Sequence, residues 1–502
     1  MNEDRTTAMS HAPTSDAPEL DPAGISPPPP LTQAQRAAVI GAGVVAAIAL
    51  PDHEPGLGLA VTWVAIVAAV LLTRPSGTWA GAWRRSMIAV AALAAGLPAW
   101  SDAGWVVAPA LLVAVGVAVL GFAGGATWLG MVRPALRCVP VGFGSFGAVA
   151  AGLRDALPTD VRRHPGVRAT LLTIVLLGVF GALFASADRL FGRLVERFLV
   201  PDLDLGLFPV RAFVAVLVTV GAATLVRLRA RARDDRPVPA PSRHLRGIEW
   251  QVPLGALVLL FAGFVALQFG VLFGGHERVL ATAGLTYAEY ARGGFAQLVA
   301  VAVLTLVVIA ATGRYAAAGT LREVRVRRGL LAGLCLLTLV VLLSAHHRLS
   351  LYEDAFGFTR LRFAATAVIV WLAVVFFLVL AAGATRKVGL LPRALALVTA
   401  LAVSGIGYLQ PDARIAEWNV ERYLAEGRID VDYLADLSAD AVPALLELPD
   451  EVRGCVLGPH VVDLVQGADG RWPAWSMTRA RAERLLEAHG PLPACGEAAR
   501  GG

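Results

Sequence analysis

Charged residues are scarce in this sequence. Asp, Glu, Lys and Arg together make up 16% of the 502 residues, whereas 56% are hydrophobic. Water-soluble domains carry about 25% charged residues, so the composition excludes a soluble globular protein. We therefore expect the lipid bilayer to be the main partner of this chain.

Lysine is almost absent, since Lys387 is the only one, and the net charge of +6 is carried by arginine. Arginine binds phosphate well, but alanine, valine and glycine are abundant as well. The joint abundance of arginine, alanine, valine and glycine is typical of a GC-rich genome, so we infer no phosphate-binding function from the arginines. Positive charge is also what the cytoplasmic loops of membrane proteins carry, so we expect no nucleic acid as a partner.

Motifs of the common catalytic classes are missing. The chain has no GxxxxGK[ST], HExxH, CxxC or GxSxG pattern, each of which would indicate a familiar kind of active site. The glycine-rich VGFGSFG, residues 141–147, superficially resembles a dinucleotide-binding loop but lacks the strand–helix setting of such a loop. We expect tight packing or a re-entrant turn there, and the sequence indicates no catalytic residue, cofactor or metal centre.

The chain does have a series of long apolar runs. A membrane-spanning helix needs about 20 apolar residues, with about 17 as a minimum. Three runs in the first third are Ala/Gly-rich and marginal: Ala37–Leu50, Leu57–Leu72 and Met87–Ala99. Eight runs are clear: Trp105–Ala126, Ala169–Ala187, Leu207–Val226, Val252–Phe273, Phe295–Thr312, Leu330–Ala345, Phe363–Gly383 and Leu391–Tyr408. Together they predict an all-α, polytopic membrane bundle of about eleven spans. A further apolar run, Val139–Leu153, is too short and glycine-rich, so we expect it to be interfacial or re-entrant.

Arginine alternates between the links that join these runs. Five links are basic: Thr73–Arg85, Thr127–Arg168, Arg227–Glu249, Gly313–Gly329 and Ala384–Arg393. The links between them hold less positive charge: Pro51–Gly56, Trp100–Gly104, Ser186–Gly206 and Gly274–Gly294. Because basic links stay in the cytoplasm, the alternation predicts a cytoplasmic N-terminus and an extracytoplasmic C-terminus.

The two ends of the chain differ from the membrane region. Residues 1–35 are polar, proline-rich and acidic, without the basic and apolar segments of a signal peptide, so we expect a disordered cytoplasmic tail. Residues 412–502 contain amphipathic helix patterns such as MTRARAERLLEAHG. We expect them to form a small helical module on the outer face, with 36–168 and 169–411 as the two parts of the membrane region.

Four ordered motifs carry a family resemblance: SADRLF, TYAEYARGGF, RLSLYEDAFGFTRLRF and WNVERYLAEGRIDVDYLADLSADAVPAL. Over roughly Ala169 to Leu448 the chain resembles a bacterial family known as domain of unknown function forty-one seventy-three, with its close relative forty-one fifty-three. The resemblance implies a multi-pass protein of the bacterial cytoplasmic membrane, and it brings no established activity.

The stretch HHRLSLYEDAFGFTRLR, residues 346–362, is the strongest candidate for a site. It falls on the predicted outer side although it is arginine-rich, against the charge rule. If the preceding helix continues outward, His346 and Glu353 share a face, as do His347 and Asp354. Two other predicted outer links contribute one candidate acid each, Asp188 and Glu289. The candidate ligand-binding residues are Asp188, Glu289, Arg292, His346, His347, Glu353, Asp354, Arg360 and Arg362.

Two kinds of ligand suit this candidate site. Arginines beside an acidic pair favour a phosphate-bearing or lipid-linked ligand, and the histidines would allow a divalent cation. The alternative is a set of exposed ion pairs, each worth about 0–1 kcal/mol.

Several function classes remain open. The first is a transporter, flippase or envelope assembly factor with an outward-facing polar site. The second is an outer-leaflet enzyme, such as a lipid-linked glycosyltransferase, in which Asp52 and Glu54 of PDHEPG would be the first-loop acids. The third is a structural or regulatory membrane component.

The four cysteines lie in two different parts of the chain, two in the membrane region and two in the C-terminal tail. Cys335 lies inside a predicted span and Cys138 in a basic link, whereas Cys455 and Cys495 both lie in the predicted outer tail. Because that side of the membrane is oxidising, we predict a Cys455–Cys495 disulfide.

Overall fold

A computed structural model of the chain describes residues 30–51, 54–72, 81–123, 127–156, 208–230, 245, 247–273, 295–316, 319–467, 472–493 and 495. Over these residues the fold is all-α and contains sixteen α-helices. The predicted fold class is therefore confirmed at this level.

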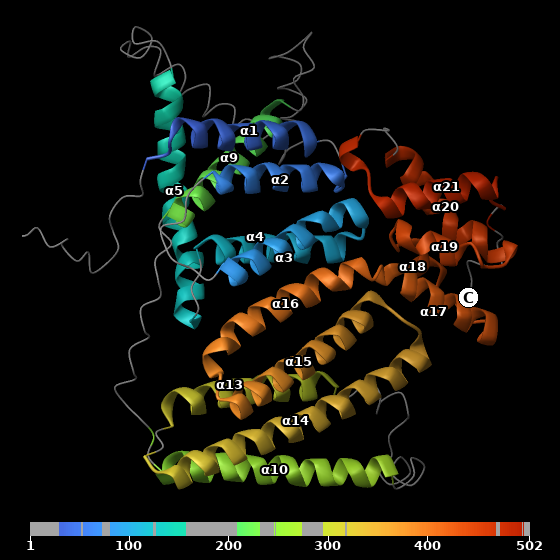
Figure 1. Ribbon diagram of the computed structural model, residues 1–502. Helices are drawn as coiled ribbons and strands as arrows, with labels where there is room; N and C mark the ends of the chain where they lie inside the picture. Colours follow the sequence, from blue (N-terminus) through green and yellow to red (C-terminus); the bar gives the residue numbers. More distant parts are fainter. Residues whose placement is uncertain are drawn as a thin grey trace, which may run out of the picture.

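The apolar runs become a stack of long helices. Figure 1 shows α1 to α4, α10 and α13 to α16 lying one above another, so that they run between the same two sides of the molecule. The helices of this part are α1 (Gln33–Ala49), α2 (Leu57–Leu71), α3 (Gly81–Trp100), α4 (Gly104–Ala123), α5 (Trp128–Ala156), α9 (Phe208–Ala230), α10 (Gly247–Phe273), α13 (Phe295–Tyr315), α14 (Leu321–Phe356), α15 (Arg360–Thr385) and α16 (Leu391–Tyr408), with the 3-10 turn η1 (Val388–Leu390) before the last.

Seven helices among the described residues are long and apolar enough to cross a membrane. Seven of the eight clear predicted spans correspond to them, and the eighth, Ala169–Ala187, lies outside the described residues. The segments are Gly104–Phe122, Val210–Ala230, Gly247–Leu267, Ala296–Tyr315, Leu321–Phe356, Arg360–Thr385 and Val388–Tyr408. These seven candidate spans indicate a multi-pass membrane protein. They do not establish the predicted count of about eleven, because α1 and α2 have only 17 and 15 residues.

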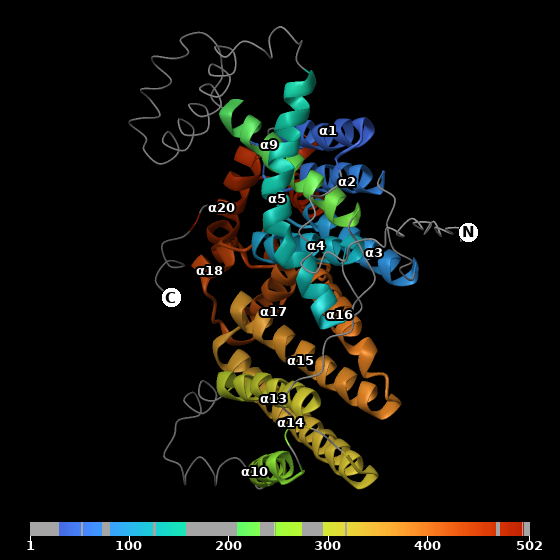
Figure 2. The same cartoon turned by 90° about the vertical axis from the view of Figure 1, so that its left-hand side faces the viewer.

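The predicted interfacial run Val139–Leu153 lies inside α5, a continuous helix of 29 residues. Figures 1 and 2 show α5 running across the stack, near one end of the other helices. A continuous helix excludes the re-entrant turn that the glycines suggested as one alternative.

The membrane helices bury two main apolar cores. The first lies between α1 to α4 and α9 and also includes Ala400 of α16. The second lies between α10, α13, α14 and α15. Because α9 and α16 pack with the N-terminal helices, helices from beyond residue 168 contribute to the first core.

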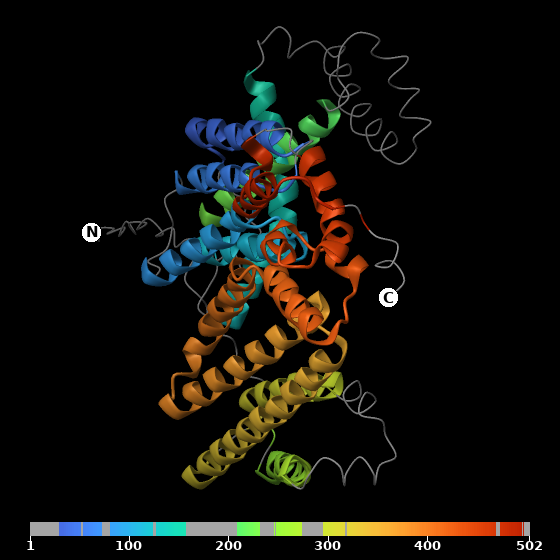
Figure 3. The same ribbon diagram turned by 90° about the vertical axis from the view of Figure 1, so that its right-hand side faces the viewer.

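The C-terminal residues form a small helical module with its own core. The module consists of α17 (Pro411–Glu426), α18 (Val431–Ala435), η2 (Ala439–Ala441), α19 (Val442–Leu445), α20 (Asp450–Gly467), η3 (Trp472–Ala474) and α21 (Met477–His489). Its fully buried side chains include Ile415, Leu445 and Leu457. Cys455 in α20 is joined to Cys495 by a disulfide, with Cα atoms 4.6 Å apart. Figures 1 and 3 show this module at the end of the helix stack that lies opposite α5.

Candidate functional site

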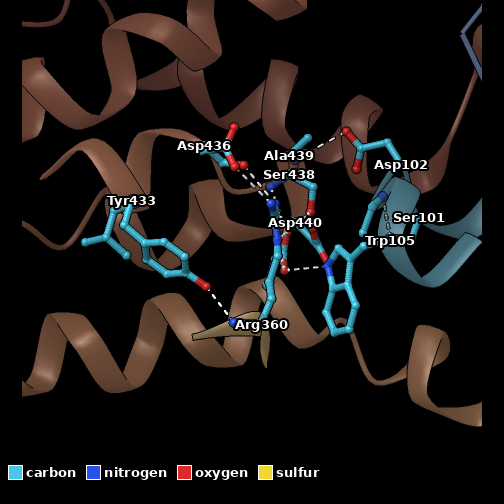
Figure 4. A network of polar contacts seen from close by, with 12 residues as sticks. Ser101, Asp102, Trp105, Arg360, Tyr433, Asp436, Ser438, Ala439 and Asp440 are labelled. Carbon is cyan, nitrogen blue, oxygen red and sulfur yellow. Dashed lines mark hydrogen bonds and ion pairs between the residues drawn. The ribbon is translucent and has the colours of Figure 1, made fainter. Parts of the chain in front are cut away.

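Polar side chains from three separate parts of the chain meet where the module contacts the membrane helices. One part is the short link between α3 and α4, another is the start of α15, and the third is the module itself. Figure 4 shows these groups, among them Asp102, Trp105, Arg360, Ser438 and Asp440, gathered into one network. We refer to the carboxylates of Asp102, Asp412 and Asp440 as the acid cluster.

Asp412 is the most enclosed member of the acid cluster. The chain leaves α16, turns through Gln410 in the left-handed region and starts α17 at Pro411, which places Asp412 in the first helical turn. Its side chain is 0% exposed. One carboxylate oxygen accepts a hydrogen bond from Trp105 Nε1 at 2.9 Å, and the other accepts from the Ser438 backbone N–H at 3.0 Å and hydroxyl at 2.8 Å.

Arg360 is the principal cationic partner of Asp412. It is the first residue of α15, directly after the N-cap Thr359. Its Nη2 lies 2.6 Å from Asp412 Oδ2 and its Nε 3.1 Å from Asp412 Oδ1. The remaining nitrogen, Nη1, lies 3.0 Å from a carboxylate oxygen of Asp436. The bidentate, charge-assisted pair is the strong form of this interaction, so Arg360 holds the module against a membrane helix.

The Arg360 backbone adds a second contact, because its N–H donates to the Tyr433 hydroxyl at 2.6 Å. Burial raises the pKa of Tyr433, which keeps this phenol neutral as a hydrogen-bond partner.

Asp102 links the α3–α4 connection to the module from the other side. It accepts hydrogen bonds from Thr478 Oγ1 at 3.1 Å and from the Ala439 N–H at 3.3 Å. Arg479 Nη2 lies 4.0 Å away and also contacts Glu54. Burial raises the pKa of Asp102, and the two hydrogen bonds oppose that rise. Burial likewise lowers the pKa of Arg479.

Asp440 is the acid with the strongest perturbation. Burial raises its pKa to about 7, and the neighbouring carboxylates Asp412 and Asp102 add to the rise. One of its oxygens contacts the Ser438 hydroxyl. The other, Oδ2, is buried and has no hydrogen-bond partner within the described part of the chain.

The candidate stretch 346–362 forms the end of α14, a tight turn and the start of α15. α14 continues to Phe356, so the expected helical continuation occurs, and residues seven apart lie on one face. Glu353 is buried and accepts a hydrogen bond from Thr366 Oγ1 at 3.3 Å, whereas Asp354 is exposed. Arg362 lies over the Tyr352 ring, 4.4 Å from its centroid, and also donates to the Gly357 carbonyl.

The turn at Gly357 docks against α17 of the module. Gly357 has a φ of +81°, and a Cβ there would lie 2.8 Å from side-chain atoms of both Arg422 and Asn419. Asn419 Nδ2 donates to the Phe358 carbonyl at 3.0 Å, and the Phe358 ring lies 4.4 Å from that of Trp418. This position requires glycine for its backbone angle and for space.

The family model described as Domain of unknown function (DUF4153) matches residues 87–448, well over half of the chain. The chain belongs to this family. It is the close relative that the four sequence motifs indicated, and the matched range begins earlier than the resemblance did, within α3. No curated protein and no solved structure matches the chain.

The DUF4153 range contains the acid cluster and the turn at Gly357. Two of the family-like motifs, RLSLYEDAFGFTRLRF and WNVERYLAEGRIDVDYLADLSADAVPAL, contact each other where α15 begins, through Arg360 with Tyr433 and Asp436 and through Phe358 with Asn419. Thr478 and Arg479, which contact Asp102 and Glu54, lie beyond the matched range.

The structure brings some of the predicted site residues together. Glu353 and Arg362 interact electrostatically near the turn, whereas Arg360 is engaged by Asp412 and Asp436 of the module. Asp188, Glu289 and Arg292 lie outside the described residues. Among the residues that are described, no group of three or more His, Cys, Asp or Glu side chains could hold a metal ion.

Sequence reasoning did not single out the acid cluster. Asp102 is the one acid of its short link, and Asp412 has the position of an ordinary first-turn helix acid. Asp440 and Ser438 are part of a motif that we used for the family resemblance and not as a candidate site. The available signal was the presence of acids beside span ends, where buried carboxylates are costly and tend to be functional.

Proposed function

We propose that this DUF4153 protein acts in transport or envelope assembly at a bacterial cytoplasmic membrane, through a polar site at the outer ends of its helices. The observation that carries the proposal is the polar network that joins the module to one end of the helix stack, where the predicted site residues of α14 and α15 also lie. Ionisable groups within membrane-spanning segments are costly and mark substrate or ion pathways, and we extend this rule to the helix ends that meet the module.

The orientation is part of the proposal, with the N-terminus cytoplasmic and the C-terminal module extracytoplasmic. Charge supports it, because the ends of α14, α15 and α16 away from the module are strongly basic. The basic residues there are Arg322, Arg325, Arg327, Arg328, Arg386, Lys387 and Arg393. The opposite ends of these helices hold fewer basic residues, Arg348, Arg360 and Arg362, and the positive-inside rule assigns the more basic ends to the cytoplasm.

Reporter fusions test this orientation. An alkaline phosphatase fused after Arg231 is expected to be inactive, and one fused after Asp412 active, because this reporter works only outside the cytoplasm. Fluorescent-protein fusions at the same two positions should give the opposite pattern. The same compartment at both positions would contradict the proposed topology.

The proposed ligand is phosphate-bearing, either free or linked to a lipid. Arg362 supplies the cation, because Arg360 is already engaged by two carboxylates of the module. Arg362 lies near the buried Glu353, with which it interacts electrostatically. A guanidinium beside hydrogen-bonding groups suits a phosphate oxygen.

Native mass spectrometry of the detergent-purified full chain tests this ligand. We expect a phosphate-bearing molecule to copurify, and Arg362→Gln to remove it while the yield of folded protein stays normal. Glu353→Gln should weaken its retention. The matched control is Arg428→Gln, since Arg428 is 70% exposed on the module. Retention of the ligand by both site variants, or no such ligand in the wild type, would refute this site.

The glycosyltransferase alternative depends on acids in the first outer link. Asp52 lies outside the described residues, and Glu54 is ion-paired with Arg479 of the module. That pairing gives Glu54 an anchoring role, so we place transport or assembly first.

A further inference from the structure

The Ser438 hydroxyl lies between two buried carboxylates. Its oxygen is 2.8 Å from Asp412 Oδ2 and also contacts Asp440 Oδ1. A serine hydroxyl has one hydrogen to donate, although it can accept through its lone pairs. It therefore cannot donate to both carboxylates, and one of the two contacts needs a hydrogen from the acid.

Asp412 is the acid with the fuller set of hydrogen-bond donors. It receives a bidentate guanidinium from Arg360, an indole N–H from Trp105 and the backbone N–H of Ser438. Donors of this kind stabilise the charged form of a carboxylate. The Ser438 hydrogen consequently goes to Asp412, and the hydrogen in the other contact comes from Asp440.

The second oxygen of Asp440 agrees with this assignment. Asp440 is 3% exposed, and its Oδ2 is buried without a hydrogen-bond partner in the described chain. An ionised carboxylate with a bare, buried oxygen is very costly, whereas a neutral acid is far less so. The half-empty hydrogen-bonding shell of Asp440 thus fits the neutral form.

We propose that Asp440 is a proton-binding site, and that it holds its proton in a chain from Asp440 through Ser438 to Asp412. All three residues belong to the module, and the proton is bound in the folded state. This inference goes beyond the proposed function because it requires neither a ligand nor a particular orientation.

The charged groups that act on Asp440 are Asp412 of α17 and Asp102 of the α3–α4 link. The cations nearby are engaged by these two acids, Arg360 of α15 by Asp412 and Arg479 of α21 by Asp102. Asp102 accepts hydrogen bonds from an N–H and an O–H donor, whereas Asp440 Oδ2 has no hydrogen-bond partner among the described residues. The raised pKa of Asp440, about 7, is in line with the geometry.

Proton binding at this position makes the stability of the folded chain sensitive to pH. In the unfolded chain Asp440 has the ordinary pKa of 3.8, whereas in the folded chain its pKa is about 7. The folded form holds the extra proton between these two values, so the stabilisation is complete below about pH 4 and is lost as the pH rises to about 7. One linked proton lowers the folding equilibrium constant about tenfold per pH unit across this window.

Infrared difference spectroscopy of the full chain in detergent tests the proposal directly. The wild type should show a carboxylic acid C=O band that disappears with a midpoint near pH 7. The band should be missing in Asp440→Asn and retained in the control Asp436→Asn, because the Asp436 side chain is 80% exposed. No such band in the wild type, or its persistence in Asp440→Asn, would overturn the assignment.

Thermal unfolding gives an independent readout. The amide of Asp440→Asn imitates the neutral acid, so its melting temperature should lack the decline between about pH 4 and 7 that the wild type shows. If this variant does not fold, Ser438→Ala replaces it, and the infrared midpoint should shift because the link to Asp412 is removed. An unshifted midpoint in Ser438→Ala would contradict the shared proton.

Discussion

Replacing Arg360 with glutamine is expected to lower the free energy of unfolding by about 3–5 kcal/mol, the range for breaking a buried ion pair by removing one partner. The reason is the burial of Asp412, whose side chain is 0% exposed and 2.6 Å from the guanidinium. Without Arg360, the carboxylate keeps its hydrogen bonds from Trp105 and Ser438 but loses its balancing charge. Because Arg360 is 27% exposed, we expect the lower end of the range.

Denaturation of the purified full chain, followed by tryptophan fluorescence, measures this effect. The control Arg428→Gln breaks an exposed, 4.0 Å ion pair with Glu426 and should change stability by about 0–1 kcal/mol. The double variant Arg360→Gln with Asp412→Asn should recover part of the loss, since it removes the unpaired charge as well. A single-variant loss no larger than that of the control would show that Arg360 does not hold the module.

The membrane part of the fold was largely predictable because its signal is local. A long apolar run such as Phe363–Gly383 predicts a helix without any information about the segments that pack against it. The structure has α15 over that run. The helical continuation at His346 was also foreseeable, since nothing in the sequence breaks the helix before Gly357. The short runs of the first third remained ambiguous, because α1 and α2 are close to the minimum length.

The partners of the candidate site were not predictable in the same way. Arg360 and Asp412 are separated by 52 residues, and Asp102 and Thr478 by 376. Composition identifies an excess of charge near His346–Arg362, but which acid meets which arginine depends on how the module docks. That docking is fixed by contacts such as the one between the Phe358 and Trp418 rings. Such contacts cannot be predicted from the hydrophobic periodicity or the residue spacing of the sequence.

The same limit explains why Arg360 was assigned to a ligand. An arginine on the outer side, against the charge rule, indicates a function when only the sequence is considered. The structure supplies a second reason for its position, since Asp412 and Asp436 both need a cation there. The ligand hypothesis consequently moves to Arg362, which makes a cation–π contact with Tyr352 but has no carboxylate within ion-pair distance among the contacts that the structure shows.

Replacing Cys455 and Cys495 together with serine is expected to destabilise the module by about 4 kcal/mol, on the chain-entropy account of a disulfide. The bridge spans 40 residues and ties α20 to the chain beyond α21, so its loss frees the second half of the module. The wild-type module should lose the same stability under reducing conditions. Cys138→Ser is the control, because Cys138 lies in α5, away from the module.

Thiol labelling of unfolded protein decides whether the bridge exists in the cell. Cys138 and Cys335 are the free cysteines of the structure, so unreduced protein should take up two labels per chain and reduced protein four. Four labels without reduction would refute the bridge. That result would also weaken the extracytoplasmic assignment, because a module exposed to the oxidising side is expected to hold its disulfide and one in the cytoplasm is kept reduced.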